Sequence, residues 1–169
     1  IGEVLVSGPS VMQGYYGQEQ QSGTALRDGW LRTGDLGYLA DGELFVCGRK
    51  KDLVILHGRN YYPQDIEWAV HAVPGVRSGG VVAFGSGAFG EKERLIIVSE
   101  VTGGPQTGEA SLALTRAITT CVSDAFGIRP DEVVLVPAGT LSKTSSGKLQ
   151  RARTRSLYET GRLTRMEEE

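Results

Sequence analysis

The chain has 169 residues, of which 40% are hydrophobic and 22% are charged, and its formal net charge is −2. This composition is typical of a soluble globular protein, and the near-neutral charge argues against a nucleic-acid-binding surface. Cys47 and Cys121 are the only cysteines. Their spacing indicates neither a disulfide framework nor a metal site, which favours a reducing, cytoplasmic setting. No apolar stretch approaches the length of a membrane span.

The first fifty residues are predicted to be β-rich. Short β-prone segments at 4–6 and 44–47 are separated by Gly-Pro and Asp-Gly pairs that are typical of hairpin turns. The charged run 48–52 interrupts this pattern, so we place a domain boundary at Lys51, between residues 1–50 and 51–169. Because the sequence opens inside an apparent strand, we expect it to be a fragment of a longer protein.

Residues 51–169 are predicted to form a compact α+β domain. The expected elements are a hairpin over 53–62 with its turn at 57–60, a helix at 63–73, strands at 81–84 and 95–98, a helix at 114–125, a strand at 133–136 and a helix at 149–158. This order is that of an α+β fold, and the domain is large enough to hold its own core. The last residues, 166–169, are expected to be a solvated end.

Several weaker motifs give little evidence for a functional site. Residues 85–90 spell G-x-G-x-x-G after a strand, but a second strand pattern follows instead of a helix. A glycine-rich connection is therefore favoured over a dinucleotide site. His57 and His71 lack ligand partners at useful spacing, and we interpret both as non-catalytic.

The hydroxyl-rich run 141–148 ends in Lys148, whose long stem could bring a cation to a phosphate or carboxylate. Its small residues and Gly147 would let the loop move. Ordinary solvated loops share this composition. A P-loop is excluded because Ser142 stands where its first glycine belongs and Leu149 replaces its magnesium-binding hydroxyl. A solvated helix face would equally explain the local basic cluster of Lys143, Lys148, Arg151, Arg153 and Arg155.

Two further motifs precede this lysine. Residues 30–37 place Asp35 in an expected tight turn, where its carboxylate could accept two hydrogen bonds from a vicinal diol. The run 48–52 places Arg49 and Lys51 at the domain boundary. The plain alternatives are a turn aspartate and a charged entry to a hairpin.

With these motifs in this order, the chain resembles the C-terminal portion of the adenylate-forming superfamily, which includes acyl-CoA synthetases, luciferases, nonribosomal adenylation domains and fatty acyl-AMP ligases. The resemblance rests on residues 2–8 with 14–16, and on residues 32–35, 48–52 and 143–148. It implies that residues 1–50 are the β-rich end of a large N-terminal domain. Residues 51–169 would be the small α+β lid that carries the catalytic lysine.

The resemblance also implies roles for individual residues. Lys148 would be the catalytic lysine, Asp35 the ribose-hydroxyl ligand and Arg49 a second nucleotide contact. Lys51 would be the hinge between the two domains. The hairpin around Gly58 would serve the second half-reaction, in which the acyl group leaves the adenylate for its acceptor. ATP and AMP would be bound together with Mg²⁺, whose ligands are expected in the missing N-terminal region. No metal ligands are expected in this chain, and the fragment alone is expected to be inactive.

Residues 57–67 indicate the subfamily. Their Arg-Asn-x-Tyr-Pro-Gln-Asp-Ile-Glu run is similar to that of fatty acyl-AMP ligases. This implies a fatty acid substrate and transfer of the acyl group to the phosphopantetheine arm of an acyl carrier protein. From charge and hydropathy, as above, no nucleic-acid partner and no membrane span are expected. The alternatives are an acyl-CoA synthetase, a nonribosomal peptide adenylation domain or a non-catalytic interaction module.

Overall fold

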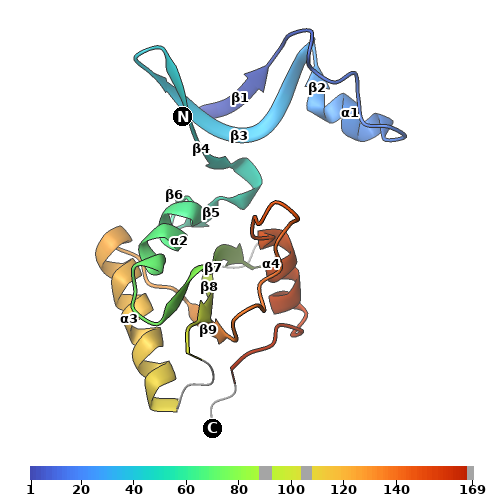
Figure 1. The fold of residues 1–169 in the computed structure, drawn as a ribbon. Coiled ribbons are helices and arrows are strands. Elements are labelled where there is room, and N and C mark those ends of the chain that lie inside the picture. The colour runs from blue at the N-terminus through green and yellow to red at the C-terminus, as the bar shows by residue number, and fades with distance from the viewer. Residues whose placement is uncertain (88–92, 104–107, 167–169) are drawn as a thin grey trace. The chain divides into compact units, whose positions relative to one another are not determined.

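The chain folds into two compact units, Ile1–Asp52 and Leu53–Glu169. The structure, a computed structural model, describes residues 1–87, 93–103 and 108–166 (Figure 1). The division falls two residues beyond the boundary predicted at Lys51. That residues 1–50 belong to a larger N-terminal domain stays a prediction.

The first unit is an antiparallel sheet built around one long strand. Its elements are β1 (Gly2–Val6), α1 (Glu19–Ala25), β2 (Leu26–Arg27), β3 (Trp30–Ala40) and β4 (Glu43–Arg49), followed by a 3₁₀ turn at Lys50–Asp52. The strand β3 pairs with all three other strands. Asp-Gly pairs at 28–29 and 41–42 join the strands with positive φ at both residues, as a type I′ turn requires.

Two features of the first unit differ from the prediction. The helix α1 is not predicted, because its sequence Glu-Gln-Gln-Ser-Gly-Thr-Ala has no apolar periodicity and buries no residue. Residues 30–37 belong to the eleven-residue strand β3 instead of a tight turn. Their Trp-Leu-Arg-Thr start is compatible with a strand, and Gly34, at positive φ, lies in a bulge within it.

The second unit has the predicted order of elements and an α+β fold, which confirms the predicted fold class. These are β5 (Val54–Leu56), β6 (Arg59–Tyr61), α2 (Pro63–His71), β7 (Val76–Ser86), β8 (Arg94–Val101), α3 (Gly108–Phe126), β9 (Glu132–Val136) and α4 (Arg151–Glu159). The sheet has the order β7-β8-β9, with an antiparallel first pair and a parallel second pair.

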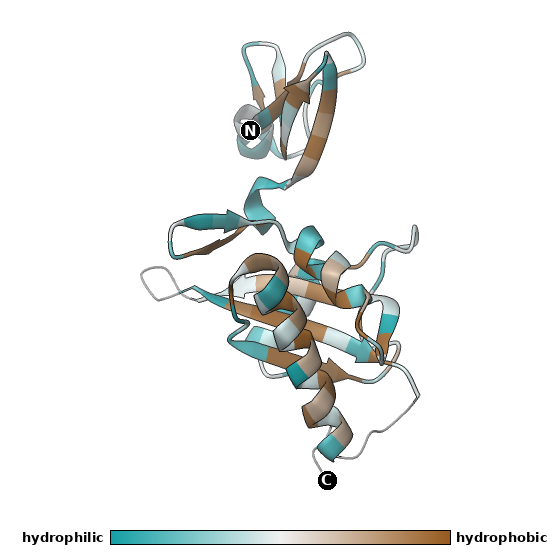
Figure 2. Cartoon of the chain, turned by 90° about the vertical axis from the view of Figure 1, so that its left-hand side faces the viewer, coloured by the Kyte–Doolittle hydropathy of each residue, from teal (hydrophilic) through white to brown (hydrophobic). Residues whose placement is uncertain are grey.

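This sheet carries a core on each face, because alternate residues of a strand point to opposite sides. One face packs against α2 and α3 through Val81, Ala83, Leu95, Ile97 and Leu135. The other packs against α4 and the segment before it through Val82, Phe84, Ile96, Val98, Val134 and Val136. Figure 1 shows α3 and α4 on opposite sides of the strands, and Figure 2 shows hydrophobic residues along them.

Several local expectations for the second unit are corrected. The turn between β5 and β6 has two residues instead of four, because His57 and Gly58 both adopt positive φ and close a tight hairpin. Arg151 is not on a solvated face, since it is paired and largely buried. Met166 is not solvated either, because it packs against the core and its N–H donates to the carbonyl of Leu135 at 3.0 Å.

The glycine-rich run 85–90 lies partly outside the described residues, from 88 onward. The strand β7 continues through Ser86, and β8 begins at Arg94. Of the solvated end expected at 166–169, residues 167–169 also lie outside the described range.

Within the described part of the chain, no helix is long and apolar enough to cross a membrane. The same residues contain no group of three or more His, Cys, Asp or Glu side chains that could hold a metal ion.

Candidate functional site

Asp35 lies at an irregularity in the middle of β3. The pairing of β1 with β3 shifts between Glu3 and Leu5, and Gly34 in the opposing segment has φ +74°. A bulge of this kind changes the direction of the side chain that follows it. Thr33 fixes the bulge, because its hydroxyl donates to the carbonyl of Val4 at 2.8 Å and accepts the N–H of Asp35 at 3.0 Å.

Arg49 is the cross-strand partner of Asp35. The two residues are opposite each other in the β3–β4 ladder, and Nε of Arg49 lies 3.4 Å from Oδ1 of Asp35. The side chains are 60% and 37% exposed. An exposed ion pair of this kind adds little stability. The structure therefore brings together two of the predicted nucleotide contacts, with solvent access to both.

Lys51 lies in the 3₁₀ turn Lys50–Asp52, at the end of the first unit. Its neighbour Lys50 lies 3.5 Å from Glu3, which also accepts a 2.7 Å hydrogen bond from Arg32. The hydrogen bond from Arg32 lowers the pKa of Glu3, and the attraction of Arg32 and Lys50 adds to this effect. The first unit thus ties its last turn to β1 through a carboxylate.

Lys148 lies on a closed hairpin before α4. Gly147, at φ +80°, donates its N–H to the carbonyl of Thr144 at 2.9 Å, and Thr144 N–H donates to the carbonyl of Lys148 at 2.8 Å. The hydroxyl of Thr144 accepts the N–H of Lys148, and Lys143 pairs with Leu149 below the turn. The loop is therefore a hydrogen-bonded hairpin instead of an open coil, with exposed residues from 143 to 148.

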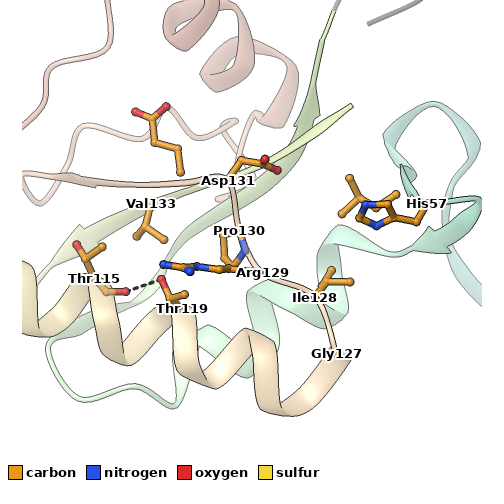
Figure 3. A pocket seen from close by; sticks show the side chains of 11 residues that line it. His57, Thr115, Thr119, Gly127, Ile128, Arg129, Pro130, Asp131 and Val133 are labelled. Carbon is orange, nitrogen blue, oxygen red and sulfur yellow. Dashed lines mark hydrogen bonds between the residues drawn. The ribbon is translucent and has the colours of Figure 1, made fainter. Parts of the chain in front are cut away.

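Gly58 occupies the second position of the β5–β6 turn, with φ +75°. His57, at φ +51°, also lines a cavity of about 560 Å³ between the hairpin, the end of α3 and the start of β9. Figure 3 shows Arg129 and the hydroxyls of Thr115 and Thr119 around it, and Thr119 donates to the Thr115 carbonyl at 2.8 Å. The sequence did not predict this cavity.

Gly58 and Lys148 are anchored on opposite faces of the β7–β9 sheet. The hairpin that carries Gly58 is fixed by Val54 and Leu56 in the core beneath α2 and α3. The hairpin that carries Lys148 is fixed by Leu141 and Leu149 in the core beneath α4. The second unit therefore carries Gly58 and Lys148 on different sides of one sheet.

Sequence reasoning missed three residues that support the lysine hairpin: Glu67, Glu100 and Arg151. The sequence is compatible with a solvated helix position for Arg151, and it shows Glu67 only as the last residue of the 57–67 motif. Glu100 offered one signal, since a carboxylate inside the apolar strand pattern 95–101 must be paired if it is buried. Its partners are distant in sequence.

Residues 51–168 match the family described as Disco-interacting protein 2-like, AMP domain. A protein of Caulobacter vibrioides that is provisionally named an acyl-CoA synthetase is 41% identical over 95% of this chain. The medium-chain-fatty-acid–[acyl-carrier-protein] ligase JamA of Moorena producens is 39% identical over 99%. The chain spans 28% and 30% of the lengths of these two relatives.

A solved structure of fatty acyl-adenylate ligases from E. coli and L. pneumophila superposes with a TM-score of 0.80 and 38% identity. The match covers 95% of this chain and 28% of that chain. These similarities confirm the resemblance predicted from the ordered motifs. The chain therefore belongs to the Disco-interacting protein 2-like AMP-domain family, as a fatty acyl-AMP ligase-like part of the adenylate-forming superfamily.

Proposed function

We propose that this chain is part of an enzyme that activates a fatty acid with ATP, forming an acyl-adenylate and pyrophosphate. The acyl group would then pass to the phosphopantetheine arm of an acyl carrier protein. One observation carries this proposal: the chain is similar over at least 95% of its length to both a carrier-protein ligase and a fatty acyl-adenylate ligase. The 57–67 motif supports the same subfamily.

Lys148 is the proposed catalytic residue. A fatty carboxylate oxygen forms a bond to the α-phosphorus of ATP while the bond to pyrophosphate breaks, so two anions must approach each other. An ammonium group between carboxylate and phosphate oxygens offsets this repulsion, most strongly where water is excluded. The exposed hairpin supports this role, because it presents the lysine at the surface of its unit, where a second domain could cover it.

Asp35 and Arg49 are the proposed nucleotide contacts. Asp35 would accept hydrogen bonds from the two ribose hydroxyls, and Arg49 would hold its carboxylate in place while reaching toward the nucleotide. Their ion pair supports this assignment, since both side chains remain accessible while their backbones are fixed in one ladder. Mg²⁺ is expected to accompany ATP, with ligands outside this chain, and a cytoplasmic location is proposed from the cysteine content.

Lys51 is the proposed hinge about which the second unit rotates between the two half-reactions, adenylation and acyl transfer. Rotation there would withdraw Lys148 from the active site of the full-length protein and present the hairpin around Gly58 to that same active site. The opposite anchoring of the two hairpins supports such an exchange, because a single rigid unit could not offer both features at once. Closures of this type need only a few backbone dihedrals to change.

The test uses the full-length protein with ATP and a series of fatty acids. We expect pyrophosphate release and an acyl-adenylate that persists until a phosphopantetheinylated carrier protein is added, which then becomes acylated. The 169-residue chain by itself should release no pyrophosphate. Absence of fatty-acid-dependent pyrophosphate release from the full-length protein would overturn the proposal.

An acyl-CoA synthetase is the second candidate, and the provisional name of the Caulobacter relative favours it. The same assay separates the two, with free coenzyme A as the acceptor. Rapid formation of acyl-CoA, together with no acylation of the carrier protein, would select this candidate.

A further inference from the structure

The hairpin that carries Lys148, taken as residues 139–150, is held at its start by a buried carboxylate. Glu100 on β8 has no exposed surface, and its Oε1 accepts the N–H groups of Gly139 at 2.9 Å and Leu141 at 2.8 Å. Its Oε2 accepts a 2.6 Å hydrogen bond from Nη1 of Arg77. Burial of a carboxylate is costly unless donors replace its hydration. The three donors meet that need, and two of them belong to the start of the hairpin.

The strand β7 is shaped around this carboxylate. Its pairing with β8 shifts between Val76 and Val81, and Gly79 within the shift has φ +64°. A Cβ atom at Gly80 would lie 2.8 Å from Cβ of Glu100 and 2.9 Å from its Oε2. The bulge and the missing side chain therefore leave the space that Glu100 occupies.

A second carboxylate holds the end of the hairpin. Arg151, the first residue of α4, donates through Nη2 to both oxygens of Glu67 on α2, at 2.8 and 2.9 Å. The two side chains are only 16% and 13% exposed. A bidentate pair with this geometry fixes direction as well as distance.

The same pair closes the free edge of β7. Glu67 accepts the N–H of Ala83 at 2.9 Å, and Nε of Arg151 donates to the carbonyl of Ala83 at 3.0 Å. Edge groups of a sheet need partners when they are covered. Glu67 and Arg151 supply both, so the start of α4 is attached to a rigid strand three residues after Lys148.

We propose that Glu100 and Glu67, the latter through Arg151, are positioning residues for Lys148. This inference rests on the proposed role of Lys148 in adenylation. Both ends of the hairpin are tied to one sheet, and the Lys143–Leu149 pair joins its two arms. The stem of Lys148 therefore starts from a fixed point. Displacement of a catalytic group by about 1 Å can lower a rate about a hundredfold.

The test compares Glu100→Ala with Glu100→Gln in the full-length protein. Both variants lose the charge, but glutamine keeps an oxygen that can accept the two N–H groups of the hairpin. We expect Glu100→Ala to lower kcat for adenylation about 10- to 100-fold with little change in KM, and Glu100→Gln to recover most of that rate. Transfer from a supplied acyl-adenylate should be unchanged in both, because that step does not use Lys148.

The decisive arm repeats Glu100→Ala in a Lys148→Ala background. If Glu100 acts through Lys148, the second substitution should cause almost no further loss. Equal loss of rate in both backgrounds would overturn the inference while leaving the proposed function intact. Unchanged adenylation in Lys148→Ala alone would instead overturn the proposed function.

Two further variants keep the test informative if Glu100→Ala does not fold. Arg151→Lys cannot keep the bidentate pair and the bond to Ala83 together, so it should also lower kcat, again only where Lys148 is present. The matched control is Glu132→Gln, which alters a carboxylate whose hydrogen bonds, among the described residues, go to Tyr158, Arg165 and Arg94 and not to residues 139–150. It should keep the wild-type kcat. A loss in Glu132→Gln equal to that in Arg151→Lys would show a general structural effect and contradict the positioning role.

Discussion

His71 is a partly buried histidine at the end of α2. Its Nε2 atom is buried and has no hydrogen-bond partner among the described residues. Burial lowers the pKa of His71 below its usual value of 6.5. The imidazole is therefore held neutral in the folded protein, where a positive charge would have to be desolvated.

This environment predicts a dependence of stability on pH. Because the folded-state pKa lies below the unfolded one, the unfolded chain binds more protons as the pH falls under about 6.5. The free energy of unfolding should be unaffected by His71 above pH 7, and should decrease from about pH 6.5 until the folded-state pKa is passed. Urea unfolding of this chain between pH 7.5 and 5.5 measures the effect.

His71→Gln should remove this pH dependence, because glutamine does not titrate. His57→Asn is the matched control, since it removes the other histidine, which is exposed at a turn, and leaves His71 in place, so that the decrease caused by His71 should remain. An unchanged slope in His71→Gln would contradict the assignment.

Candidate site residues could be named from the sequence where they stand in a short motif, and their roles stay predictions. Asp35 and Lys148 stand in short runs whose spacing is informative, and Arg49 follows from the same kind of pattern. Glu100 was not predictable as a support, because its partners Gly139 and Leu141 are about forty residues away. Only the folded chain brings them to one carboxylate.

At the level of elements, hydrophobic periodicity predicted the order of the second unit but not the bounds. The run 81–84 is the most apolar part of β7, yet the strand begins at Val76, since backbone pairing continues on both sides of the Gly79–Gly80 bulge. The Asp-Gly pairs correctly predicted the hairpin turns at 28–29 and 41–42. The pair His57–Gly58 was a less specific signal, because His-Gly is not among the preferred pairs of two-residue hairpin turns.

The bulge at Gly34 is the element-scale feature that sequence could not separate from a turn. Glycine with positive φ serves both structures, and the local sequence contains no further distinction. What decides between them is pairing: β1 pairs with β3 on both sides of Gly34, and β4 pairs with β3 from Asp35 onward. Such pairing depends on segments far apart in the chain.

For the whole molecule, the proposed hinge gives a specific prediction. Lys51→Pro fixes φ at residue 51 and restricts Lys50, so rotation between the units should become difficult. In the full-length enzyme we expect adenylation to be nearly unchanged and acyl transfer to fall about tenfold or more, as for other closure-dependent steps. Separate assays of pyrophosphate exchange and of transfer from a supplied acyl-adenylate measure the two steps.

Lys51→Ala is the control for the hinge, because it removes the charge and keeps the backbone free. It should support both steps at close to wild-type rates. Equal losses of adenylation and transfer in Lys51→Pro would argue for general damage instead of a blocked rotation.

In the proposed mechanism, the second unit, Leu53–Glu169, supplies Lys148, the lysine that makes adenylation possible. Its most direct test is fatty-acid-dependent pyrophosphate exchange by the full-length protein carrying Lys148→Ala, with Lys143→Ala in the same hairpin as the matched control. Loss of a preorganised charge-stabilising donor costs about 3–4 kcal/mol, so exchange should fall several hundredfold in Lys148→Ala and remain near wild type in Lys143→Ala. Wild-type exchange in Lys148→Ala would contradict the account.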